Sequence, residues 1–254
     1  MKHKKKQINW IKLIISILSF SAVIGFILIA FWWSDHQKSL AITHVRFGET
    51  NILNNHIYKA TLGEIIGNNP NDISLNDVSD LMESHPYVNA ARVSHQYPGI
   101  IQIEIIERVP IALLNTDPMV MLDAEGIILP SIDNLGDFNL PVLTNFNPEP
   151  ELYPTGKKAL SIKVIDCINW LSKIQNEYES LYNNISEMKM TSNNEMELIL
   201  SDQPTHIYLG ESDVWSRIKI LKQFENELGN KKMSDFAYLD MRYDNQIIAK
   251  GRRL

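Results

Sequence analysis

The chain has 254 residues, 44% of them hydrophobic and 21% charged, which excludes a disordered or fibrous protein and suits one or two compact domains. Its one cysteine, Cys167, excludes a disulfide framework and a thiolate metal cluster, and is interpreted as a small apolar core residue. The net charge of −6 divides into +5 for residues 1–38 and −11 for residues 39–254, and this acidic larger part excludes nucleic acid as a partner because it repels phosphate backbones.

A basic tail is followed by an uncharged run of 21 residues, 13–33. A helix needs roughly 20 residues to cross the hydrocarbon core of a membrane, and tryptophans at both ends of the run suit the two interfaces. The run is longer than the apolar part of a cleavable signal peptide, and no small-x-small cleavage site follows it. The sequence therefore predicts an uncleaved single-pass anchor. Five lysines before the run place the N-terminus in the cytoplasm and everything after Trp33 outside.

After a polar linker, the sequence predicts one strand and two short helices. The strand spans about 42–47, where apolar and polar residues alternate. The first helix ends at Gly67, and the second begins at Ser74, a suitable N-cap, and ends before Pro86. The apolar face of the first helix consists of Leu62, Ile65 and Ile66.

Two further strands are predicted on either side of the turn signal Pro98-Gly99. In the second strand, isoleucines at 101, 103 and 105 alternate with polar residues, as expected where one face is buried. The order of strand, two helices and two strands predicts a small α+β unit that ends near Pro110.

From Ile111 the sequence predicts a second, larger α+β domain. Residues 119–130 form a hairpin pattern whose turn spans 123–126, and the Pro-rich segment 131–154 follows as a loop. A second hairpin is predicted from "MELIL" and "HIYLG", and a helix precedes Gly229. A long amphipathic helix lies between the hairpins, with apolar residues at Leu160, Val164, Ile168, Leu171, Ile174, Tyr178 and Leu181.

The stretch "YLDMRYDNQIIAKGRRL" (238–254) predicts two strands with a turn at Asp244-Asn245. Alternation from Tyr238 places Tyr243 on the apolar face, and the last strand, 246–250, can present an unpaired edge. This edge is either an ordinary sheet margin blunted by lysine and arginine, or a docking edge for a partner strand. The pattern leaves both interpretations open.

The spacing of polar residues predicts neither catalysis nor a metal or cofactor. Seven histidines are scattered without ligand spacing. Residues 155–158 resemble the end of a phosphate loop, but Glu151 stands where its first glycine would be. No motif of an activated serine or cysteine is present. The sequence therefore predicts a protein that is not an enzyme.

Three stretches resemble the FtsQ/DivIB family of bacterial division proteins. They are "HPYVNAARVSHQYPGIIQIEIIERVPIALL" (85–114), "LDAEGIILP" (122–130) and "YLDMRYDNQ" (238–246). The order of basic tail, anchor, small domain and larger domain also matches. The resemblance implies a cytoplasmic tail (1–9), a transmembrane anchor (10–33), a linker (34–40), a POTRA domain (41–110), and a β domain with C-terminal partner-binding strands (111–254).

The resemblance further implies a non-enzymatic scaffold of the divisome, anchored in the inner membrane, with its bulk in the periplasm at the division septum. FtsB and FtsL would bind the C-terminal strands and FtsK the POTRA region, and FtsW and FtsI would be further partners. A contact tyrosine of the family falls on Tyr243, and Lys231 or Lys232 stands near a basic position, of which Lys232 is taken. The implied contact residues are Tyr243, Asp244, Asn245, Gln246, Ile247, Ile248, Ala249 and Lys232. Asn245 and Gln246 replace the serine and glycine of the family.

Two other functions remain open. A POTRA-type secretion or assembly factor would use the small domain for other clients, although no run of barrel strands follows it. Location at the septum would distinguish this function from that of a division scaffold. A membrane-anchored cell-wall hydrolase would need converging polar groups, which the sequence does not predict.

Overall fold

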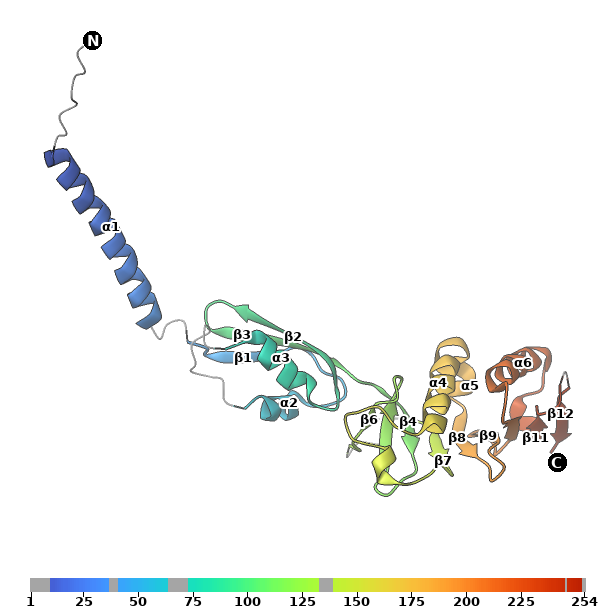
Figure 1. Ribbon diagram of the computed structural model, residues 1–254. Coiled ribbons are helices and arrows are strands. Elements are labelled where there is room, and N and C mark those ends of the chain that lie inside the picture. The colour runs from blue at the N-terminus through green and yellow to red at the C-terminus, as the bar shows by residue number, and fades with distance from the viewer. Residues whose placement is uncertain (1–9, 37–40, 64–72, 133–138, 245, 253–254) are drawn as a thin grey trace, which may run out of the picture.

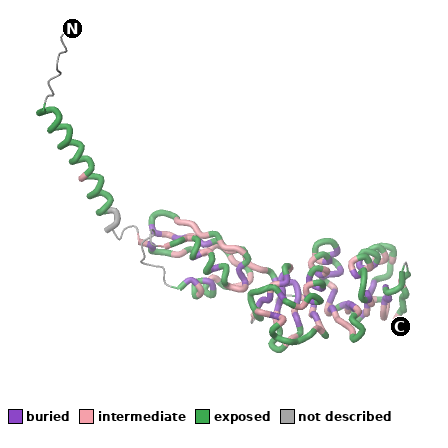
Figure 2. Tube along the Cα trace, in the orientation of Figure 1, coloured by how far each residue is buried: buried purple, intermediate pink, exposed green. Residues whose placement is uncertain are grey.

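A computed structural model of the chain describes residues 10–36, 41–63, 73–132, 139–244 and 246–252 (Figure 1). Helix α1 (Trp10–His36) contains the predicted anchor. Its segment Trp10–Trp33 has a mean hydropathy of 2.7, and it is long and apolar enough to cross a membrane. The side chains of Trp10–Trp33 are almost all exposed, whereas the buried residues lie in the later strands and helices of the chain (Figure 2). The helix therefore fits a single-pass anchor.

The smaller sheet has the strand order β1-β3-β2, with β1 parallel and β2 antiparallel to β3. Two helices pack on it, and their buried residues Tyr58, Val78 and Met82 meet Ile101 and Ile103 of β3. The order of elements is the predicted one of strand, two helices and two strands. The elements are β1 (His44–Phe47), α2 (Asn55–Leu62), α3 (Leu75–Glu83), β2 (Val88–Gln96) and β3 (Ile100–Glu107). We call this part the small unit.

The start of α3 is confirmed and the end of α2 is not. The Asp77 N–H donates to Ser74 Oγ over 3.2 Å, as an N-cap requires. Helix α2 ends at Leu62 because Gly63 adopts a φ of 67°, a left-handed value that glycine reaches without strain. The prediction that this helix ends at Gly67 is therefore wrong. Ile65, Ile66 and Gly67 lie outside the described residues.

The larger sheet has nine strands in the order β12-β11-β10-β9-β8-β7-β4-β5-β6. The α-helices of this part lie on one side of it (Figure 1), and their buried residues pack against the sheet in one continuous core. The strands are β4 (Pro110–Leu114), β5 (Val120–Asp123), β6 (Ile128–Leu129), β7 (Val142–Thr144), β8 (Ile185–Met190), β9 (Met196–Leu200), β10 (His206–Gly210), β11 (Phe236–Asp240) and β12 (Ile248–Gly251). The helices are η4 (Pro150–Leu152), α4 (Ile162–Glu177), α5 (Glu179–Tyr182), α6 (Val214–Glu227) and η5 (Met233–Asp235). We call this part the large unit, and together the two units confirm the predicted α+β class.

Both predicted hairpins are present, as the antiparallel pairs β5–β6 and β9–β10. The long predicted helix is instead two helices, because Tyr178 leaves the helical conformation with a φ of −149° and separates α4 from α5. Leu160 precedes α4 and is 64% exposed, so its place on the buried stripe is also wrong. The predicted loop 131–154 contains β7, which joins β4 to β8 in the middle of the sheet.

Cys167 lies in α4, fully buried, as predicted for a core residue. Burial raises the pKa of its thiol, so little of the reactive thiolate forms. We expect native protein to react with a thiol reagent such as DTNB at less than about a hundredth of the rate of protein unfolded in guanidinium. Rapid labelling of the native protein would show that α4 opens readily.

Candidate functional site

The two margins of the large sheet differ in how they are covered. At the β6 margin, the N–H of Ile128 donates to the Lys157 carbonyl over 2.9 Å, and the N–H of Gly156 donates to the Ile128 carbonyl over 2.8 Å. At the other margin, all four residues of β12 are exposed, and no described strand pairs with its outer side. The β12 margin is therefore the side of this sheet on which a further strand could be added.

The hydrogen bonds of β11 show which of its backbone groups face β12. The N–H of Met241 donates to the Tyr208 carbonyl of β10 over 2.9 Å. Backbone groups of successive residues in a strand point to opposite sides, so Leu239 also faces β10. Tyr238 and Asp240 therefore face β12.

The same alternation identifies the free groups of β12. Ile248 and Lys250 are opposite the two residues of β11 that face β12, so their N–H and C=O groups point inward. The N–H of Arg252 also points inward, because it donates to the carbonyl of Asp235, the last residue of η5, over 3.0 Å. Ala249 and Gly251 therefore direct their N–H and C=O groups outward. We call these groups, together with β12, the docking edge.

Arg242 links several side chains on the face of the sheet beside the docking edge. Its guanidinium donates to both carboxylate oxygens of Asp240, over 2.9 and 2.7 Å, and to Glu195 over 3.0 Å. It also lies over the Tyr208 ring, 5.3 Å from the centroid. The hydrogen bonds from Arg242 hold the pKa of the Asp240 carboxyl below its ordinary value, so this pair stays charged at neutral pH.

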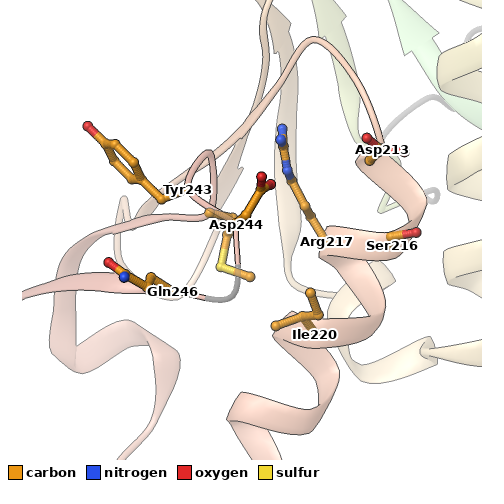
Figure 3. A pocket seen from close by; sticks show the side chains of 8 residues that line it. Asp213, Ser216, Arg217, Ile220, Tyr243, Asp244 and Gln246 are labelled. Carbon is orange, nitrogen blue, oxygen red and sulfur yellow. The ribbon is translucent and has the colours of Figure 1, made fainter.

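A cleft of about 290 Å³ lies between α6 and the turn that joins β11 to β12 (Figure 3). Arg217 projects from α6 into this region and donates to the backbone carbonyls of Leu209 and Arg242. Tyr243 points away from α6 and is 54% exposed. The cleft is lined by Asp213, Ser216, Arg217, Ile220, Met241, Tyr243, Asp244 and Gln246.

The structure corrects parts of the predicted site. Tyr243 does not lie on a buried apolar face, because β11 ends at Asp240 and the alternation ends with it. The last strand is 248–251 rather than 246–250. Lys232, whose place in the site stays a prediction, is the N-cap of η5, at the end of β11 opposite to Tyr243.

The remaining predicted residues lie along the turn and the docking edge. Asp244 and Gln246 are exposed, Ile247 packs partly against the core, and Asn245 lies outside the described residues. Ile248 and Ala249 belong to β12. Within the described part of the chain, no three His, Cys, Asp or Glu side chains gather as a metal site would require.

Residues of the cleft that come from α6 were not predicted. Arg217 and Ile220 lie on the part of α6 that faces the turn after β11. The sequence predicts a helix before Gly229, as observed for α6, but its pattern holds no information on which distant turn that helix meets. Gly251 was also missed, since sequence alone does not show which residues of an edge strand face outward.

A family model described as "Cell division protein FtsQ/DivIB, C-terminal" matches residues 112–242, which is just over half of the chain. Proteins named "Cell division protein FtsQ" are also similar. Those of Syntrophotalea carbinolica and Geotalea daltonii are each 22% identical, over 72% and 70% of this chain, and that of Aliivibrio fischeri is 25% identical over 67%. The matches span 64%, 64% and 59% of these relatives, less than two thirds of their length. The chain belongs to the FtsQ/DivIB family of cell division proteins.

Proposed function

We propose that this protein is a non-enzymatic scaffold of the divisome that binds a partner by adding the partner's strand to the docking edge. The observation that carries the proposal is the outward direction of the backbone groups of Ala249 and Gly251 at a margin that no described strand covers. Unpaired N–H and C=O groups of an edge strand bind an extended peptide through main-chain hydrogen bonds. The opposite margin, by contrast, is covered by residues 156–159.

Side chains beside the docking edge could select the partner, which main-chain hydrogen bonds alone do not do. Tyr243 is a large, half-exposed aromatic residue in the turn that joins β11 to β12, and such residues are frequent anchors of protein interfaces. Lys250 projects from β12 with its Nζ 5.8 Å from the centre of the Tyr238 ring. A partner strand with an apolar side chain near Tyr243 and an acidic one near Lys250 would fit this surface.

We propose FtsB and FtsL as the partners at this edge, on the strength of the family to which the chain belongs. The apolar segment Trp10–Trp33, with lysines before it, supports a single-pass orientation in the inner membrane with both units in the periplasm. In this proposal residues 41–110 are a POTRA domain and residues 111–254 a β domain. The small unit would meet FtsK, and FtsW and FtsI would join the assembly at the septum.

The test uses the full chain in lipid nanodiscs, with the periplasmic segments of FtsB and FtsL as ligands. Saturable binding to the FtsB and FtsL segments together, which is lost when a proline in β12 removes an outward N–H, would support the proposal. A well-folded chain that binds neither segment, together with a fluorescent fusion spread evenly around the cell membrane, would overturn it. That result would favour a secretion or assembly factor with other clients.

Tyr243→Ala should weaken binding of the FtsB segment by roughly 10- to 30-fold, since buried aromatic anchors contribute about 2 kcal/mol to an interface. The melting temperature should not change, because Tyr243 is half-exposed and lies outside the strands. The measurement is a titration by isothermal calorimetry. The control is Tyr97→Ala, which removes a 70% exposed tyrosine from the small unit. Equal affinities of both variants and the unmodified chain would remove Tyr243 from the site.

A further inference from the structure

The connection between the two units is very short. Strand β3 of the small unit ends at Glu107, and β4 of the large unit begins at Pro110. Arg108 and Val109 are therefore the whole link between the two sheets. A link of two residues limits the relative movement of the units, but it does not by itself fix one orientation.

Glu107 binds a loop of the small unit. Its carboxylate accepts hydrogen bonds from the backbone N–H groups of Asn51, Ile52 and Leu53, over 2.5, 2.9 and 2.9 Å. It also accepts the hydroxyl of Tyr58 over 2.6 Å. Burial raises the pKa of Glu107, but these hydrogen bonds outweigh it and leave the pKa below its ordinary value. The charged carboxylate thus holds residues 51–53 in place.

Arg108, the next residue, binds the large unit. Its guanidinium donates to Asp123 Oδ2 over 2.7 Å, and the Asp123 side chain is only 2% exposed. The other oxygen of Asp123 accepts from the N–H groups of Glu125 and Ile127, over 3.0 and 2.8 Å. The carboxylate that receives Arg108 is therefore fixed in the turn between β5 and β6, and its burial shields the ion pair from screening by salt.

Tyr87 joins the units a second time. Its backbone carbonyl accepts the N–H of Arg108 over 2.9 Å, and its hydroxyl donates to the Pro130 carbonyl over 2.5 Å. The ring is buried with Met121 and Leu129 of the large unit. Ile52 and Leu53, the residues whose N–H groups Glu107 holds, pack against the same cluster. The loop bound by Glu107 is thus one wall of the contact between the units.

We propose that Glu107 and Arg108 form a clasp that holds the small and large units in one orientation. Glu107 shapes the surface that the small unit offers, and Arg108 fastens it to the turn of β5 and β6. The docking edge then keeps a fixed direction relative to the part of the protein nearest the membrane anchor. The clasp lies at the opposite margin of the large sheet from β12, so it stands whether or not β12 binds a partner.

The test measures the distance distribution between spin labels on the two units of the full chain in nanodiscs. Labels go on Asn76→Cys in α3 and Asn169→Cys in α4, both exposed positions, in a Cys167→Ala background. We expect one narrow distribution. The double variant Arg108→Ala/Tyr87→Phe loses the ion pair and the hydroxyl contact but keeps the buried ring, and its distribution should be at least twice as wide.

The matched control is Glu125→Ala. Glu125 is a second, weaker partner of Arg108, 3.4 Å away and 64% exposed, so its loss should leave the width unchanged. Circular dichroism of each variant verifies that both units stay folded. A broad or two-peaked distribution in the parent protein would overturn the proposal without any variant. An unchanged width in the folded double variant would overturn it as well.

Discussion

Ala249→Pro should weaken binding of the FtsB segment by about 30-fold or more without unfolding the large unit. The N–H of Ala249 faces outward, so its loss removes a donor from the docking edge and none from the pairing with β11. One lost ladder bond and the bulk of the proline ring against the incoming strand together cost about 2 kcal/mol. The residue is exposed, and proline is tolerated on edge strands where the N–H faces solvent. Calorimetry against the FtsB segment measures the loss.

Two variants separate the backbone effect from the side-chain effect. Ala249→Val keeps the N–H and favours a strand, so it should bind like the parent chain. Ile248→Pro removes an N–H that faces β11, so it should lower the melting temperature as well as the affinity. Parent-like affinity of Ala249→Pro would show that no strand is added at this edge.

Short-range chemistry explains what the sequence predicted correctly. Ser74 caps α3 through one hydrogen bond three residues away, and the turns at Pro98-Gly99 and 123–126 depend on residues within the turn itself. Ile101 and Ile103 alternate with polar residues because only one face of β3 is buried. Each of these features needs only its neighbours in the chain, so a pattern of a few residues is enough to locate it.

Features that depend on distant parts of the chain were missed. Strand β7 has three residues, and its membership of the sheet comes from β4 and β8 on either side. The break at Tyr178 lies within an unbroken apolar stripe, and its hydroxyl binds Glu225 of α6. At the site, the outward direction of Ala249 depends on the register with β11, and the position of Arg217 depends on how α6 docks. No local pattern carries that information.

Glu107→Ala should lower the free energy of unfolding of the small unit by about 3 kcal/mol. The change removes the acceptor for three backbone N–H groups and leaves the hydroxyl of Tyr58, a buried residue, without its partner. Hydrogen bonds to a charged group contribute about 1.5–3 kcal/mol each, and part of the loss is recovered when water reaches the N–H groups. Urea unfolding of the full chain measures the change. Glu104→Ala, three residues earlier and exposed, is the control and should cost less than about 0.5 kcal/mol.

The same contacts predict how the stability of the small unit depends on pH. Because folding lowers the pKa of Glu107, its stabilising effect is present above the ordinary pKa of glutamate, about 4.3, and is lost as the pH falls through the lower value of the folded state. Glu107→Gln has no proton to gain, so its stability should fall less steeply below about pH 4.5 than that of the parent chain. Burial also lowers the pKa of His85, but that effect begins at higher pH and is common to both proteins. Parallel stability curves between pH 3 and 5 would mean that the Glu107 carboxylate does not hold residues 51–53. Glu107 would then not shape the loop that forms one wall of the contact between the units, and its part in the clasp would fail.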